Sequence, residues 1–541
     1  MPYPKEDVVF FTGNRLLYDE RQYDVVAQQQ IFENLSASLT SNMTLLLKQF
    51  RIVQLFIFIN KSVWKHLLYI DEQRGIFEEI MDVVEKQQGS VIFLYGYGGT
   101  GGRTGHSRFK ITVPTLETSI CNIEKQDDLA ELLKMTDLII WDEAPMANKS
   151  CFESLEKSLR DIMSGTSHAS KTVFGGKVVV FGSDFRQILP VIPRGTRSDI
   201  IHAKINASYI WDHCKVLRLT KNMRLQTGDN ASSTADDIRS FSEWILKIGD
   251  GTMCEPNDGY VDICIPYEFL ISNFSDPVKA IVEDTYPDLI LKYLDSNYLQ
   301  SHAILASTIE VVDDINQYIT NLLPGEEKEY FSSDSIDKSD VTSCDAYENL
   351  TPEFLNALKT SRLPKNSIRL KVGATIMLMH NLGQSEGLCN GTRLTVTRLA
   401  NHVIEAKIIS GKNIGNLIYI PIMSLSPSQS PWPFKLLRRQ FPLIVSFAMT
   451  INKSQGQSLD NVCLYLPKEV YSHGQLYVVI SRVKSNKGLR ILIHDKDKQP
   501  MISTTNVVQT FTSFLRFMLQ PMLYSKKCSI TFEKVQTFTS F

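Results

Sequence analysis

The chain has 541 residues, 43% of them hydrophobic, which is enough for two to four domains that each bury a core. A net charge of −2 argues against binding of nucleic acid through the overall charge of the protein, so local basic patches must make any such contact. Nine cysteines without a C-x-x-C pair favour reduced thiols in an intracellular compartment over a zinc site or a disulfide framework.

The first 70 residues form two segments of different composition. Residues 1–40 are polar and helical in character, without a signal-peptide or transit-peptide pattern. Residues 41–70 are apolar and nearly free of acids, but their longest apolar run is far too short to span a membrane. They are explained either by a buried helix and strand or by an insertion. The insertion is favoured by sequence, because joining residue 40 to residue 71 creates an L-T-x-x-Q motif that ends at Gln73 and leads into an amphipathic run at 76–84.

A glycine-rich loop follows the apolar run 91–95, which predicts a buried strand. Five residues supply the frame of the phosphate-binding pattern G-x-x-x-x-G-K-S/T: Gly96, Gly98, Gly99, Thr100 and Gly101. The lysine that should come next is replaced by Gly102, and Arg103 is displaced by one position. Residues 102–110 also lack the apolar stripe that packs a helix. Of the three means by which such a loop holds phosphate, the backbone N–H groups remain, without the lysine or the helix terminus.

Residues 71–230 alternate apolar runs with helical periods, as an α/β sheet domain does. Continuous apolar runs at 138–141 and 178–181 predict further central parallel strands. Helices are predicted around 128–133 and 152–159.

Polar side chains follow two of these strands. Asp142 and Glu143 end the run 138–141, where phosphate-loop enzymes hold Mg²⁺ and its water; Asp142 would bind the metal and Glu143 would activate the water. A solvated loop is the alternative for an isolated Asp-Glu pair, but its position after a glycine frame favours the nucleotide site. Gln187 follows the run 178–181 and would lie at the ligand edge of the sheet, with a capping loop as the alternative.

A second domain is predicted from about residue 295, where a strand at 302–306 precedes a helix at 311–319. Residues 367–425 alternate in β fashion and predict a small β module within it. After residue 500 the heptapeptide V-Q-T-F-T-S-F occurs twice, and two copies predict a non-core appendage rather than a repeat fold.

Four polar residues, the first of them at position 224, are suited to contact phosphate groups. Arg224 and Arg482 flank apolar runs and could reach a γ-phosphate across a domain cleft, with a surface salt bridge as the alternative for each. Thr450 and Lys453 lie in a polar, glycine-containing loop after the strand 443–447. Such residues suit the backbone of single-stranded nucleic acid, although a generic loop looks similar.

Seven collinear stretches resemble the petite integration frequency (Pif) family of superfamily one DNA helicases, in the branch found in plants and in Helitron transposons. The similarity covers roughly residues 10–40 and 71–500, and its most specific stretches are 102–110, 140–146, 181–187, 219–224, 387–393, 446–457 and 475–482.

The resemblance implies an α/β fold with two RecA-like P-loop parallel-sheet lobes, a small SH3-like β module inserted in the second lobe, and an incomplete first lobe. It divides the chain into an N-terminal helical segment (1–40), an apolar insertion (41–70), the first lobe (71–230), a connecting helical segment (231–294), the second lobe (295–500, with the β module at about 367–425) and an unmatched tail (501–541).

The resemblance also implies an ATP-dependent helicase that moves 5′ to 3′ along DNA, with Mg²⁺ as the second cofactor. Single-stranded and forked DNA would be its partners, and repair, recombination and telomere maintenance in the nucleus its roles. Nucleotide-site roles are implied for Gln73 (adenine), Asp142 and Glu143 (Mg²⁺ and water), Gln187 (γ-phosphate), and Arg224 and Arg482 (arginine fingers). Four residues would lie toward single-stranded DNA: His106, Ser107, Thr450 and Lys453.

Two departures from the family pattern leave the function open. In the family the glycine loop continues into Lys-Thr, a helix and a strand, all absent before Gly102, and residues 41–70 interrupt the Q motif. The chain is therefore a working helicase, an ATPase-dead isoform or relic that at most binds nucleic acid, or the product of an imperfect gene model. Losing a strand also predicts an open sheet edge between the strands 91–95 and 138–141, and a less stable first lobe.

Overall fold

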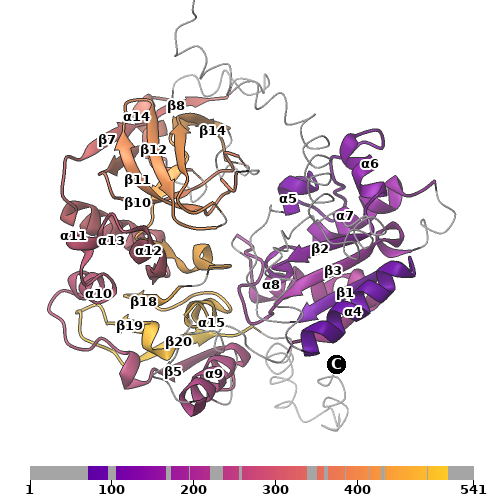
Figure 1. Cartoon of the computed structure of the whole chain (residues 1–541), viewed down its shortest axis with the longest axis horizontal. Helices are drawn as coiled ribbons and strands as arrows, with labels where there is room; N and C mark the ends of the chain where they lie inside the picture. The colour runs from indigo at the N-terminus through magenta and orange to yellow at the C-terminus, as the bar shows by residue number, and fades with distance from the viewer. Residues whose placement is uncertain are drawn as a thin grey trace, which may run out of the picture.

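The computed structural model describes most of the chain between residues 71 and 509. The described ranges are 71–95, 105–165, 172–193, 195–219, 235–254, 259–337, 350–358, 363–383, 386–411, 413–427, 432, 434–457, 459–483 and 485–509. Predictions for residues 1–70, for the glycine frame 96–101, for Arg224 and for residues 510–541 fall outside these ranges and stay predictions. Figure 1 shows two α/β lobes, with an antiparallel module beside the second. Within the described ranges, no helix is long and apolar enough to cross a membrane.

Among the described residues, four parallel strands form the sheet of the first lobe in the order β2-β3-β1-β4. Their bounds are Ser90–Tyr95 (β1), Leu138–Asp142 (β2), Val178–Ser183 (β3) and Cys214–Arg218 (β4). The three strands predicted from continuous apolar runs are confirmed. The centres of β1 and β3 are buried, which is why these strands lack the alternation of half-exposed ones.

The predicted opening between β1 and β2 is wrong, because β3 fills that place. Val180 of β3 is the register partner of Ile92 on one side and of Ile140 on the other. The strands β1 and β2 are thus consecutive in the sequence but not adjacent in the sheet. Among the described residues β2 pairs with β3 alone, so the open edge lies on the outer side of β2. An unpaired edge leaves a row of backbone donors and acceptors to water.

We expect a variant that carries the family's Lys-Thr, helix and strand between Gly101 and Gly102 to unfold at a higher temperature than this chain. The added strand would pair with the outer edge of β2, and each kcal/mol gained would raise the melting temperature of a lobe of this size by about 2–4 °C. Differential scanning calorimetry of both full-length proteins measures the difference. Melting of the unaltered chain at or above the temperature of the restored variant would contradict this expectation.

Helices cover both faces of the first sheet. On one face α4 (Asp71–Glu85) places Val84 against Ile92 and Val178. On the other, α6 (Asp128–Lys134) and α7 (Lys149–Ile162) contribute Leu133 and Phe152 to the larger core. These helices confirm the predicted periods, and α8 (Arg197–His202) follows β3.

A helical turn forms where the sequence predicted none. The four-residue helix α5 spans Gly105–Arg108. A Cβ added to Gly105 would lie 2.3 Å from the ring of Trp141, and the Phe109 ring stacks on that ring at 5.6 Å. Tertiary packing against β2 therefore supports this turn in the absence of an apolar stripe.

The second lobe contains another parallel sheet, in the order β17-β6-β18-β19. Its strands are Ala448–Thr450 (β17), His302–Ala306 (β6), Asn461–Leu466 (β18) and Leu489–Ile493 (β19). The α-helices that the structure describes in this half of the chain are Ala235–Asp250 (α9), Pro277–Thr285 (α10), Leu289–Lys292 (α11), Ser296–Ser301 (α12), Ile309–Leu322 (α13), Pro352–Ala357 (α14) and Gln475–Ile480 (α15). The predicted strand 302–306 and the helix after it are confirmed.

Two segments expected outside the lobes contribute to a further sheet. Strand β5 (Tyr260–Cys264), within the segment expected to be a helical connection, pairs antiparallel with β20 (Ser503–Val507). Asn506 and Val507 are buried, and the Asn506 side chain donates to Ile248 O at 2.9 Å. Residues 503–507 thus belong to the core rather than to an appendage, because β5 supplies a partner that no local pattern in the tail reveals.

The predicted β module is confirmed as an antiparallel sheet, in the order β13-β12-β11-β10-β16. It extends past residue 425, because β16 belongs to it. The strands are Thr375–Leu378 (β10), Arg393–Leu399 (β11), Val403–Ile408 (β12), Leu417–Pro421 (β13) and Leu443–Val445 (β16). Smaller sheets beside it use Lys328–Phe331 (β7), Ser333–Ile336 (β8), Ser367–Leu370 (β9), Met423–Leu425 (β14) and Leu436–Gln440 (β15). Described 3-10 helices are Ala144–Met146, Val173–Gly176, Ile205–Ala207, Tyr209–His213, Tyr267–Phe269, Ile451–Ser454 and Asn486–Gly488.

A buried ion pair fastens β15 to β8. The side chains of Arg438 and Asp334 are 2% and 0% exposed, and the Arg438 Nε atom lies 3.0 Å from both carboxylate oxygens. The remaining guanidinium groups donate to Pro364 O at 3.0 Å and Leu355 O at 3.2 Å. The charge of each partner is therefore compensated inside the protein.

Candidate active site

The carboxylates Asp142 and Glu143 lie at the end of β2, as predicted. Asp142 is the register partner of Gly182 on β3, and the Glu143 N–H donates to Asp142 Oδ1 at 2.9 Å. Glu143 has a left-handed backbone with φ 54°, a conformation that costs an ordinary residue about 1–3 kcal/mol and is enriched at active sites. Both side chains are half-buried. Two half-buried carboxylates thus lie at the end of β2.

Gln187 lies in a buried turn after β3. Its backbone N–H donates to Asp184 O at 3.0 Å, and its side chain is 3% exposed. Because β2 and β3 are parallel neighbours, their carboxyl ends bring Asp142, Glu143 and the Gln187 turn to the same edge of the sheet.

The second lobe meets this edge through the loop after β17. Gln455 donates from Nε2 to Gln187 Oε1 at 2.8 Å, across 268 residues of sequence. A Cβ added to Gly456, whose φ is 77°, would lie 3.4 Å from Glu143 Oε1. Side chains of both lobes therefore surround one polar site, which has the residue types that a nucleotide phosphate and a divalent cation require.

Arg482 is buried behind the same loop, with an exposed fraction of 1%. Its Nε donates to Val478 O at 3.0 Å and its Nη1 donates to Gln457 O at 3.3 Å. These acceptors belong to its own lobe, so Arg482 here fixes the loop that carries Gln455 and Gly456. Its predicted role as an arginine finger stays a prediction.

Buried polar atoms test whether a polar ligand fits this site. Ser183 Oγ, at the end of β3, and Gln455 Oε1 are buried and have no hydrogen-bond partner among the described residues. The same holds for Gln73 Oε1 on α4, the residue predicted to read adenine. Buried polar atoms normally find a partner, so Ser183 Oγ and Gln455 Oε1 fit a site that binds a polar ligand such as a nucleotide.

The residues predicted to face DNA lie on both lobes. His106 and Ser107 are in α5 of the first lobe, and Thr450 and Lys453 lie at the end of β17 and in the 3-10 helix after it. His106 is half-buried, with Nε2 at 3.4 Å from Cys151 Sγ. Burial lowers the pKa of Lys453, and the charge of Asp313 partly opposes that shift.

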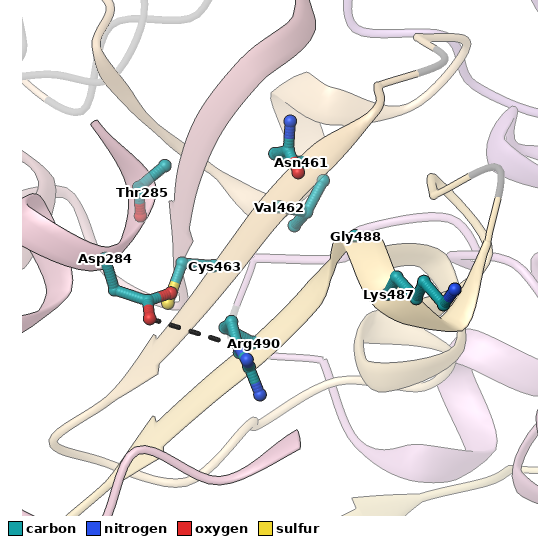
Figure 2. A pocket seen from close by; sticks show the side chains of 8 residues that line it. All are labelled: Asp284, Thr285, Asn461, Val462, Cys463, Lys487, Gly488 and Arg490. Atoms are coloured by element: carbon teal, nitrogen blue, oxygen red, sulfur yellow. Dashed lines mark ion pairs between the residues drawn. The ribbon is translucent and has the colours of Figure 1, made fainter. Parts of the chain in front are cut away.

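A cavity of about 180 Å³ lies elsewhere in the second lobe (Figure 2). Asp284 and Arg490 form an ion pair of 4.0 Å at its wall, and burial raises the pKa of the Cys463 thiol beside them. The cavity opens at the first residues of β18 and β19, whereas ligands of parallel sheets bind at the carboxyl ends of the strands. It is therefore separate from the site at Glu143 and Gln187.

Sequence reasoning missed the second-lobe partners of this site. Gln455 and Gly456 lie within a loop that was singled out for DNA contacts, yet they face Gln187 and Glu143. The signal available in the sequence was the dipeptide Gln455-Gly456, in the polar loop after the short strand β17. Its partner could not be identified without the docking of the two lobes.

Comparisons with known proteins agree with this architecture. Two family models match the chain: PIF1-like helicase over residues 100–259, and DNA helicase Pif1, 2B domain, over residues 353–399. The ATP-dependent DNA helicase PIF1 of Xenopus laevis is 30% identical over 369 residues, covering 66% of this chain and 46% of the relative. The PIF1 of Homo sapiens is 34% identical over 150 residues, 27% of this chain and 22% of the relative. The chain thus spans less than half the length of these vertebrate relatives.

Solved structures share the fold. The Pif1 helicase from Bacteroides, in complex with ADP-AlF3 and single-stranded DNA, superposes with a TM-score of 0.53 at 18% identity, covering 83% of this chain and 97% of that one. The Pif1 helicase from Candida albicans gives 0.51 at 18% identity, covering 84% and 99%. With two family models matched in order and a relative that is 30% identical over 66% of this chain, the protein is similar to the PIF1-like helicases.

Proposed function

We propose that this chain is an ATP-dependent 5′–3′ DNA helicase of the Pif type. The observation that carries the proposal is the site shared by the two lobes, where Glu143 faces Gly456 and Gln187 accepts a hydrogen bond from Gln455. A site divided between two lobes lets nucleotide binding and hydrolysis change how the lobes dock, which is how a motor converts hydrolysis into movement.

ATP and Mg²⁺ are the cofactors that the residues fit. Asp142 would hold the metal, Glu143 would take a proton from the attacking water, and Gln187 would contact the γ-phosphate. Gln73 would contact adenine, and the glycines 96–101 would supply backbone N–H groups to the phosphates. When bound, Mg²⁺ would neutralise charge that develops on the phosphate oxygens.

Single-stranded and forked DNA are the proposed partners, with His106, Ser107, Thr450 and Lys453 toward the strand. The Bacteroides and Candida proteins share the fold, and the Bacteroides one is bound to single-stranded DNA. Roles in repair, recombination and telomere maintenance, and residence in the nucleus, are proposed from the family.

A second candidate is an ATPase-dead isoform, relic or mispredicted product that at most binds nucleic acid. The observation that favours it is Gly102 at the position of the phosphate-loop lysine. A hydrogen bond to a charged group contributes about 1.5–3 kcal/mol, and phosphoryl transfer depends on such contacts even more strongly. Sequencing the transcript across codons 101 and 102 tests the gene model; an uninterrupted join of Gly101 to Gly102 rules out a prediction error.

Strand separation tests the helicase proposal directly. The expected result is ATP-dependent unwinding of a duplex with a 5′ single-stranded tail and none of a duplex with a 3′ tail. Binding of both substrates without unwinding of either would favour the second candidate.

We expect Lys453→Met to weaken binding of single-stranded DNA several-fold, because it removes one phosphate contact. The slope of log affinity against log salt should become shallower by about 0.7, the counterion release of one single-stranded phosphate. Fluorescence anisotropy over a salt series measures both. Lys468→Met, at an exposed position after β18, is the matched control and should bind like the parent. An unchanged salt slope in Lys453→Met would remove this residue from the DNA interface.

A further inference from the structure

We propose that His473 and Tyr477 of the second lobe are positioning residues that hold the turn Asp184–Gln187 of the first lobe in place. The consequence for catalysis rests on the proposed nucleotide role of Gln187. The docking itself is a property of the chain without nucleotide, and it is measurable by itself.

His473 connects the two lobes through both ring nitrogens. The Gln509 N–H donates to Nδ1 at 2.8 Å, so Nδ1 is the acceptor and Nε2 carries the proton. Nε2 then donates to Phe185 O at 2.8 Å in the first lobe. The side chain is 4% exposed, and burial lowers the pKa of His473 to about 4, so the ring stays neutral with this tautomer fixed at neutral pH.

Tyr477 lies in α15, four residues after His473, and holds the carboxylate of the same first-lobe turn. Its hydroxyl donates to Asp184 Oδ2, and both residues are at most 2% exposed. The other oxygen, Oδ1, accepts from the Arg186 N–H at 3.0 Å. A buried carboxylate requires such donors, so the second lobe supplies part of the compensation for a charge of the first.

Close packing and charged groups near these two contacts also determine how the two lobes approach each other. Gly474 has φ 73°, and a Cβ there would lie 2.3 Å from Arg186 O, so a larger residue would push the lobes apart. Arg186 Nε donates to Asp250 Oδ1 at 2.7 Å at the end of α9, and its guanidinium lies 5.4 Å from the centre of the Tyr95 ring. The turn that bears Gln187 is thus held from α9, α15 and β1 together.

Three variants of the full chain separate docking from general stability. His473→Asn keeps an acceptor near Nδ1 but loses the donor to Phe185 O, whereas His473→Gln keeps a donor near the position of Nε2. Tyr477→Phe removes the hydroxyl and keeps the ring. Hydrogen–deuterium exchange without nucleotide should show the amides of residues 183–187 exchanging about ten-fold faster in His473→Asn and Tyr477→Phe, and at the parent rate in His473→Gln.

Peptides of β18 serve as the internal reference and should exchange at the parent rate in all three variants. The proposal is overturned by unchanged exchange at 183–187 in His473→Asn, or by equal acceleration in His473→Asn and His473→Gln. Faster exchange in β18 as well would also overturn it, because that result means loss of lobe stability rather than of docking. Absence of ATP hydrolysis would instead contradict the proposed function. The exchange rates would still show whether His473 and Tyr477 hold the turn Asp184–Gln187.

Discussion

Replacing Glu143 with glutamine is expected to lower DNA-stimulated ATP hydrolysis by about 10²–10⁴-fold, the contribution of a well-placed general base. Glu143 is held at the end of β2 by a left-handed backbone, and its Oε1 faces Gly456 of the second lobe. Glutamine preserves the length of the side chain but cannot take a proton from water. The chemical step is therefore lost while the packing is kept. Steady-state hydrolysis, measured with and without single-stranded DNA, gives the ratio.

Glu131→Gln is the matched control for this substitution. Glu131 lies on α6 with its side chain 60% exposed, and its ion pair with Lys134 is of the surface kind that contributes little. Its hydrolysis rate should equal that of the parent. If the parent hydrolyses ATP no faster than Glu143→Gln, the helicase proposal fails and the ATPase-dead candidate takes its place.

Replacing Arg438 with methionine should destabilise the sheet β14-β15-β8 by about 3–5 kcal/mol, because Asp334 would stay buried without its counter-charge. The guanidinium also donates to carbonyl groups that the methionine thioether would leave without a donor. Native-state hydrogen exchange of β15 over a urea series measures the loss locally, which suits a chain of several domains that does not unfold in two states.

Two further variants isolate the charge as the cause. Arg439→Met changes the exposed neighbour on the same strand and should leave the exchange of β15 unaltered. The double variant Arg438→Met with Asp334→Leu removes both charges and should recover most of the stability, because no buried charge remains uncompensated. A double variant as unstable as Arg438→Met would mean that packing, rather than charge, dominates at this position.

Most of the elements around the site could be predicted from the sequence. The strands β1, β2 and β3 follow from short continuous apolar runs, because strands covered by helices on both faces have no polar side. Asp142, Glu143 and Gln187 follow from their position after such strands, since parallel strands end at a common edge. The helix α5 was missed, because the ring of Trp141 supports it instead of a stripe of its own.

The order of strands could not be predicted in the same way. The sequence places β1 next to β2, but β3 lies between them in the sheet, and the open edge is therefore on the far side of β2. Likewise the partner of β20 is β5, more than two hundred residues earlier in the chain. Strand pairing depends on which surfaces meet after the helices have packed. The local periodicity of the sequence predicts the strands but not their partners.

The sequence by itself determined the family resemblance, the parallel-strand core of each lobe, the carboxylates at the end of β2 and the missing phosphate-loop lysine, because all of these are properties of neighbouring residues. The tertiary structure alone decided that Gln455 reaches Gln187, that Gly456 faces Glu143, and that His473 and Tyr477 hold the turn between them. Each of these pairs joins residues hundreds of positions apart in the two lobes. Their contact exists because the lobes dock with buried, complementary polar groups, a property of shape and burial that residue order does not contain.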